Sequence, residues 1–161
     1  MKYLVTGGAG FIGTNIVIRL KKDGHDVVVL DNYSAGKKED HMQDGVEYVE
    51  GDIRDLDILI RTMEGVDGVF HHAAVPRVTY SVEHPVETHD NNVNGTLNVL
   101  VAAKDTGVKR VVFATSSSVF GCDEKIDLTE DMPKRPKSPY ALHKLMGQEY
   151  CRLFAELYGL E

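Results

Sequence analysis

The sequence has 161 residues, of which 42% are hydrophobic and 7% aromatic, and its formal net charge is -7 at pH 7. This length suits one domain with a hydrophobic core of its own, so we expect a single domain over residues 1–161. The acidic balance argues against nucleic acid as a partner, and no apolar run approaches the roughly 20 residues that a membrane-spanning helix needs.

Five short apolar segments rich in β-branched residues alternate with helical patterns along the chain. The segments predicted as strands are residues 3–5, 27–30, 46–49, 66–70 and 111–114. The helices predicted between them are residues 11–22, 55–64 and 86–105. This alternation favours an α/β fold with a doubly wound, Rossmann-like parallel sheet, helices on both faces and strand order 3-2-1-4-5.

A glycine-rich turn follows the first predicted strand and opens the first predicted helix. The spacing of Gly7, Gly10 and Gly13 permits a tight turn and a close approach of the backbone, while the helix N-terminus directs N–H groups at a pyrophosphate. Asp31 ends the second predicted strand, where a carboxylate accepts hydrogen bonds from the adenosine ribose and repels a 2′-phosphate. Together these features predict NAD rather than NADP; the alternative is a structural turn followed by an ordinary surface acid.

Small or polar residues also follow the third and fourth predicted strands, as Gly51-Asp52-Ile53 and His71-His72-Ala73-Ala74. Small side chains there would let the backbone approach a cofactor, although Asp52 could instead be a plain helix cap. The two histidines are adjacent, so on a strand they point to opposite faces. We therefore expect no metal site.

The last predicted helix begins with Ser138 as its N-cap and Pro139 as its first residue, and it ends before Gly159. It carries Tyr140 and Lys144 one turn apart on one face, where the cation favours the tyrosinate and lowers its pKa. The ammonium can also hold the nicotinamide ribose.

A serine just beyond the fifth predicted strand supplies a third polar group. Ser116 is placed so that its hydroxyl can bridge a substrate alcohol and Tyr140, which would make a proton relay with Lys144. The alternative is that this run of serines is simply a solvated loop.

The cysteines and the N-terminus bear on the compartment. Cys122 and Cys151 form neither a CxxC pair nor a disulfide framework, and no charged-then-apolar secretion signal opens the chain. We expect a reducing, cytoplasmic setting in which both cysteines are ordinary small side chains.

The motifs quoted so far, with DNNVNGTLNVL, SSSVFG and YALHK, occur in the order typical of one family. Over its whole length the chain resembles the extended short-chain dehydrogenase/reductase family, within it the NAD-dependent epimerase/dehydratase group, and it looks most like the UDP-glucose 4-epimerases. The resemblance implies Ser116, Tyr140 and Lys144 at the reaction centre. The cofactor-binding set that we expect is Gly7, Gly10, Phe11, Ile12, Gly13, Asp31, Asn32, Ser34, Gly36, Asp52, Ile53, Ala73, Ala74, Val75, Asn91, Tyr140 and Lys144.

The resemblance further implies epimerisation of a UDP-linked nucleotide sugar at C4. Tyr140 would take the C4 hydroxyl proton as hydride moves to NAD, and the 4-keto sugar would rotate before hydride returns to its other face. Dehydratases similar to this chain carry an Asp–Glu pair directly after the catalytic hydroxyl, whereas Ser117 and Ser118 stand here. Without those carboxyl groups the obvious acid and base for elimination are missing.

Two departures from the family pattern limit the inference. Phe120 stands where this family commonly has a tyrosine, and the chain ends at Glu161 whereas relatives continue into a C-terminal substrate-binding domain, which we expect to be absent. A non-catalytic NAD-binding module, or a fragment inactive alone, is therefore the rival hypothesis. Relatives often form homodimers by packing the helices that correspond to residues 86–105 and 138–158.

Overall fold

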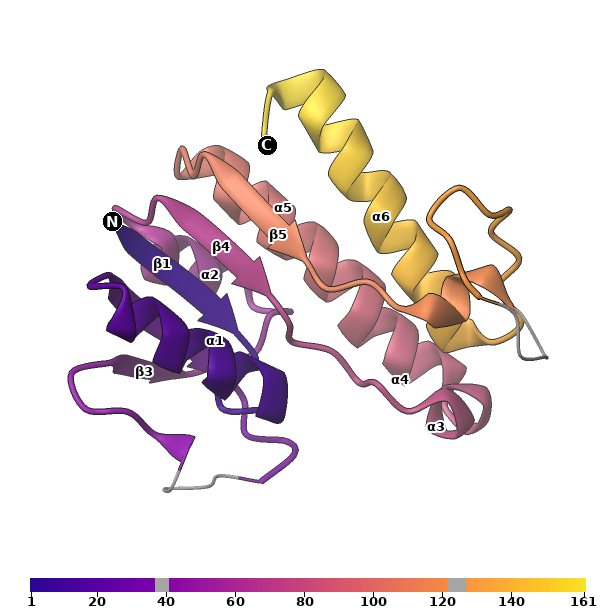
Figure 1. The fold of residues 1–161 in the computed structure, drawn as a ribbon, viewed down its shortest axis with the longest axis horizontal. Helices are drawn as coiled ribbons and strands as arrows, with labels where there is room; N and C mark the ends of the chain where they lie inside the picture. Colours follow the sequence, from indigo (N-terminus) through magenta and orange to yellow (C-terminus); the bar gives the residue numbers. More distant parts are fainter. Residues whose placement is uncertain (37–40, 122–126) are drawn as a thin grey trace.

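Five parallel strands form the centre of the computed structural model, which describes residues 1–36, 41–121 and 127–161 (Figure 1). They lie in the predicted order β3-β2-β1-β4-β5. The strands are β1 (Lys2–Thr6), β2 (Asp26–Asp31), β3 (Glu47–Glu50), β4 (Gly68–His71) and β5 (Arg110–Phe113). Since all five run in one direction, the five loops that follow them gather at one edge of the sheet.

Helices cover both faces of this sheet, as the apolar strands predict. Successive strand residues point to opposite faces, so Leu4 and Val28 pack into one core cluster while Val5 and Val29 pack into another. The helix on the second face is α1 (Phe11–Lys22), which contributes Val17. The first face is covered by α2 (Leu56–Met63), α5 (Gly95–Asp105) and α6 (Pro139–Tyr158) (Figure 1).

The prediction of one continuous α-helix over residues 86–105 was wrong, because a π-helical turn interrupts the helix. The chain forms α4 (Pro85–His89), then a π-helical turn η2 (Asp90–Asn94), then α5. Within that wide turn, Asn92 donates to the carbonyl oxygen of Val75 at 3.1 Å and accepts from its N–H at 2.8 Å. These tertiary bonds stabilise a local geometry that apolar periodicity does not reveal.

Helix α6 agrees with its predicted ends. The Ser138 hydroxyl accepts a hydrogen bond from the N–H of Ala141 at 3.2 Å, and Gly159 ends the helix with a φ of +68°. The backbone then returns to the sheet, where Glu161 donates to Lys109 and accepts from Val111.

Two further short helices that were not predicted lie within the described residues: α3 (Val78–Glu83) and the 3₁₀ turn η3 (Ser117–Phe120). Across the three described stretches, no helix combines the length and apolarity needed to cross a bilayer. Cys151 is half-buried and free, and burial raises its pKa to about 11, whereas Cys122 lies outside the described residues.

Candidate functional site

A cavity of about 440 Å³ lies where the loops after all five strands meet. Its wall contains every residue of the predicted cofactor-binding set except Asp52. The cavity therefore brings together side chains that are more than a hundred residues apart in the sequence. Lining residues that the sequence reasoning did not assign to the cofactor are Ala9, Leu30, Ala35, Gly51, His72, Pro76, Ala114 and Thr115.

The glycine turn between β1 and α1 forms one side of this cavity. Gly7 has a φ of +68°, and a Cβ there would lie 2.7 Å from the backbone nitrogen of Ala73. A Cβ on Gly13 would lie 2.2 Å from the carbonyl oxygen of Gly7, so the turn and the helix fit only without side chains. This cradle leaves the backbone bare toward the cavity, as binding of a pyrophosphate requires.

Asp31 stands beside the turn at the end of β2. Its carboxylate accepts a hydrogen bond from the N–H of Ala9 at 3.0 Å and one from the N–H of Tyr33 at 2.8 Å. These contacts fix its orientation while each oxygen retains a lone pair for a further donor. Tyr33 has a φ of +53°, which gives the loop after β2 its sharp turn. The arrangement suits two adjacent ribose hydroxyls.

The loop after β4 lies against the glycine turn and is held in place by buried polar side chains. Asn92 bonds both backbone groups of Val75, and the Thr6 hydroxyl accepts from the N–H of Ala73 at 3.3 Å. His71 is fully buried, with its ring nitrogens 2.7 Å from the Thr6 hydroxyl and 2.9 Å from the Thr96 hydroxyl. Burial lowers the pKa of His71 to about 3, so the neutral imidazole connects the hydroxyls of Thr6 and Thr96 within the core.

The two adjacent histidines of the fourth strand and its loop lie in different surroundings. Over residues 1–36, 41–121 and 127–161, no group of three or more His, Cys, Asp or Glu side chains is arranged to hold an ion. His71 points into the core, whereas His72 lines the cavity, which agrees with the opposite directions expected for neighbours on a strand.

Tyr140 and Lys144 occupy the end of the cavity beside β5. The backbone N–H of Tyr140 donates to the Ser81 hydroxyl at 3.0 Å, which ties the start of α6 to α3. The Lys144 ammonium lies 6.0 Å from the centre of the Tyr140 ring and donates to the Ala114 carbonyl oxygen at 2.8 Å. Burial lowers the pKa of Lys144 to about 8, so it remains largely charged at neutral pH.

Asn91 adds a polar residue to the cavity wall. Its Oδ1 is buried and has no hydrogen-bond partner among the described residues. Because an unsatisfied buried acceptor is costly, this oxygen is suited to receive a hydrogen bond from a bound molecule. Together with the bare glycine turn and Asp31, it makes the cavity a good fit for a dinucleotide.

The structure does not bring Ser116 and Asp52 into the cavity wall. Ser116 caps η3, where its hydroxyl accepts from the N–H of Ser118 at 3.2 Å and from its hydroxyl at 2.9 Å. Asp52 is not the helix cap either, because that position belongs to Asp55. The Asp52 carboxylate instead binds the guanidinium of Arg54, which holds its pKa far below the usual range.

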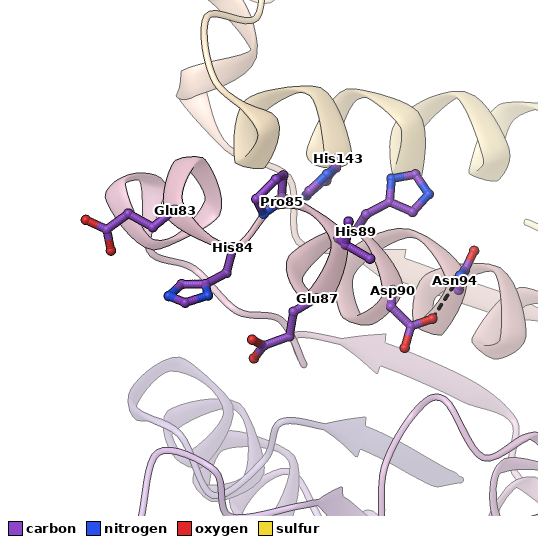
Figure 2. A pocket seen from close by; sticks show the side chains of 9 residues that line it. Glu83, His84, Pro85, Glu87, His89, Asp90, Asn94 and His143 are labelled. Atoms are coloured by element: carbon purple, nitrogen blue, oxygen red, sulfur yellow. Dashed lines mark hydrogen bonds between the residues drawn. The ribbon is translucent and has the colours of Figure 1, made fainter.

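A second hollow lies away from this cavity, on α4 and the facing part of α6 (Figure 2). His143 of α6 projects into it beside His89 of α4, with ring centres 5.3 Å apart. Burial lowers the pKa of His143 to about 4. The hollow lies on the two helices through which the resemblance implies self-association.

Comparison with known proteins adds two findings. The family model described as NAD dependent epimerase/dehydratase matches residues 3–161. A putative UDP-glucose 4-epimerase from Methanocaldococcus jannaschii is 42% identical over 160 residues, which is 98% of this chain and 52% of that protein. The chain thus spans about half the length of the curated relatives it matches.

Solved structures agree with the fold but do not separate the reactions within the family. A Thermus thermophilus UDP-glucose 4-epimerase in complex with NAD is 39% identical and has a TM-score of 0.93, with 100% of this chain and 53% of that one covered. A dTDP-glucose 4,6-dehydratase from Streptomyces venezuelae, with NAD bound, is 35% identical and has a TM-score of 0.92 over 99% of this chain and 53% of that one. The choice between epimerase and dehydratase therefore depends on side chains.

Proposed function

The chain belongs to the NAD dependent epimerase/dehydratase family, and we propose that it binds NAD and carries the proton-transfer residues of a C4 epimerase for UDP-linked hexoses. The observation that carries this proposal is one cavity with an oriented carboxylate, Asp31, at one end and the Tyr140–Lys144 pair at the other. The relatives named UDP-glucose 4-epimerase support the substrate class.

The residues that would hold NAD are those of the cavity wall. The glycine turn would receive the pyrophosphate, Asp31 the adenosine ribose, and Lys144 the nicotinamide ribose. Asn91 would offer its free oxygen to the bound dinucleotide. Bound NAD would supply a hydride acceptor at C4 of the sugar and return the same hydride, so no second redox substrate is needed.

The protein's own part in the chemistry is proton transfer. Tyr140 as the phenolate would accept the C4 hydroxyl proton when the 4-keto sugar forms, and it would return that proton after the sugar has rotated. The Lys144 ammonium, 6.0 Å from the centre of the Tyr140 ring, would place a positive charge near the side chain that transfers the proton. Ser116 would donate its hydroxyl hydrogen to the sugar oxygen, because the two hydrogen bonds from Ser118 occupy only its acceptor lone pairs.

Elimination of water is the reaction we consider less compatible with this site. Ser117 and Ser118 occupy η3, and neither carries a carboxyl group that could protonate a leaving hydroxyl at neutral pH. An epimerase needs no such acid. The dehydratase likeness is therefore assigned to shared cofactor binding.

The rival proposal is an NAD-binding module without activity of its own, and it is favoured by the position of Ser116 outside the cavity wall. Incubation with UDP-glucose, followed by chromatography for UDP-galactose, separates the two proposals if bound NAD is measured in the same sample. Conversion supports the epimerase. Bound NAD without conversion supports the module, and absence of NAD binding contradicts both.

A further inference from the structure

The Arg54 guanidinium joins two segments next to the cavity wall, and a third segment is connected to it through Asp52. The Arg54 Nε and Nη2 atoms donate to the two carboxylate oxygens of Asp52 at 2.9 and 2.8 Å. Its Nη1 donates to Asp90 at 3.3 Å. Asn32, which lines the cavity, donates to Asp52 at 2.9 Å. One side chain thus links the ends of β2 and β3 to the π-helical turn.

Each partner of Arg54 is adjacent in sequence to a residue of the cavity wall. Asp52 lies between Gly51 and Ile53, and Asp90 precedes Asn91. Arg54 itself does not line the cavity. It can therefore affect a ligand only through the placement of its neighbours.

We propose that Arg54 is a positioning residue of the cofactor site, whose bridge between Asp52 and Asp90 sets the spacing between Ile53, near the adenosine end, and Asn91 in the cavity wall. This inference rests on the proposed function, since it takes NAD as the ligand. The adenosine end is identified by Asp31, whose neighbour Asn32 belongs to the same network.

The chemistry of arginine suits this bridge. Its planar fork binds both oxygens of one carboxylate and still has a free Nη1 hydrogen for a second acid, whereas lysine presents a single point charge. Asp90 is ready to receive it, because the other Asp90 oxygen already accepts from the side chain of Asn94 at 2.9 Å (Figure 2). The two acids therefore face the guanidinium in fixed orientations.

The fold does not depend on the bridge for its stability. The side chains of Asp52, Arg54 and Asp90 are 25%, 43% and 48% exposed, and ion pairs with such exposure contribute little to unfolding free energy. Asn98 of α5 separately anchors this loop, with hydrogen bonds to the carbonyl oxygens of Ile53 and Arg54 at 3.3 and 3.0 Å. Loss of the guanidinium should loosen the spacing of the wall without unfolding the chain.

Calorimetric titration with NAD and with ADP-ribose tests the inference on the whole chain. Arg54→Gln should weaken both ligands equally, by about fivefold, the effect of losing an ion pair at the upper end of the exposed range. Arg54→Lys should fall between that variant and the wild type. Arg19→Gln is the matched control, because Arg19 pairs with Asp23 on α1 away from the cavity and should leave both affinities unchanged.

Asp90→Asn distinguishes positioning from a general structural effect. It removes the negative charge that Arg54 contacts and keeps one side-chain oxygen that can still accept from Asn94, so NAD should bind about twofold more weakly. Combined with Arg54→Gln it should add no further loss, because the bridge is then already broken. The thermal unfolding midpoints of both variants, measured without ligand, should match that of the wild type as closely as the midpoint of the Arg19→Gln control does. If Arg54→Gln fails to fold, the NAD affinity of Asp90→Asn tests the inference.

The outcomes separate the inference from the function on which it rests. If the wild type binds neither NAD nor ADP-ribose, the proposed function is wrong. If the wild type binds them and Arg54→Gln binds equally well, or the two substitutions add in full, the bridge does not position the site.

Discussion

The Lys144 ammonium donates a hydrogen bond to the carbonyl oxygen of Ala114 across 2.8 Å, and this contact joins α6 to the end of β5. The same ammonium lies 4.8 Å from the centre of the Phe113 ring. Lys144 is therefore held at the cavity by the fold itself, before any ligand arrives. Its burial lowers its pKa from 10.5 to about 8.

This pKa shift predicts how stability depends on pH. Between pH 8 and 10.5 the folded state has released the Lys144 proton while the unfolded chain still binds it, so stability rises with pH in that window. The unfolding free energy of the wild type, compared with that of Lys144→Met, should rise by on the order of 3 kcal/mol from pH 7.5 to pH 10.5, as measured by urea unfolding. Lys104 is an exposed lysine whose pKa is raised, so the unfolding free energy of the wild type should show no such rise when it is compared with that of Lys104→Met. A flat difference for Lys144→Met would mean that the ammonium is not desolvated.

Cofactor choice should depend on Asp31. The wild type should bind NAD more tightly than NADP, because the carboxylate accepts ribose hydroxyls and repels a 2′-phosphate. Asp31→Ala should reduce that discrimination by ~1.5–3 kcal/mol, the contribution of a hydrogen bond to a charged group. Asp26→Ala removes the same charge at the opposite end of β2 and serves as the control. Calorimetry that shows unchanged selectivity in Asp31→Ala would place the ribose elsewhere.

The sequence predicted the strand order and the ends of α6 because each rests on a local signal. Buried parallel strands are apolar throughout, and Ser138, Pro139 and Gly159 are explicit helix-boundary residues. The π-helical turn at Asp90–Asn94 was missed since its cause is tertiary: Asn92 bonds the backbone of Val75, 17 residues earlier.

Site prediction was limited in the same way. The loops after the strands were identified because parallel topology gathers them, but side-chain partners depend on three-dimensional contacts. Arg54 could have been suspected only as a cation two residues after Asp52 in the loop following β3. The cap made by Ser116 on η3 has a signal in the serine run, since serine hydroxyls often bond nearby backbone N–H groups.

Two alanine substitutions in the glycine turn should destabilise the fold to different extents. In Gly13→Ala the new Cβ would lie 2.2 Å from the Gly7 carbonyl oxygen, a backbone atom that cannot move without disturbing the turn. We expect a loss of about 1–3 kcal/mol in unfolding free energy, together with weaker NAD binding. In Gly10→Ala the corresponding distance is 3.3 Å, so its loss should be smaller. Equal unfolding midpoints for the two variants would show that the turn adapts to a side chain.

Replacement of the Tyr140 hydroxyl tests the proposed chemistry. Tyr140→Phe keeps nearly the same volume in a position that is only 9% exposed, so the fold and the bound NAD should be retained. The variant lacks an ionisable oxygen, and the C4 hydroxyl proton then has no acceptor when the 4-keto sugar forms. In protein that converts UDP-glucose, kcat should fall about 10²–10⁴-fold, the usual contribution of general acid–base catalysis.

A matched control for that substitution lies outside the cavity. Tyr80→Phe removes a hydroxyl that donates to the exposed Glu87 at 2.9 Å, and turnover should be unchanged. Bound NAD must be measured in each variant, because loss of NAD would lower turnover for a different reason. If Tyr140→Phe retains NAD and still turns over near the wild-type rate at neutral pH, another group accepts the proton.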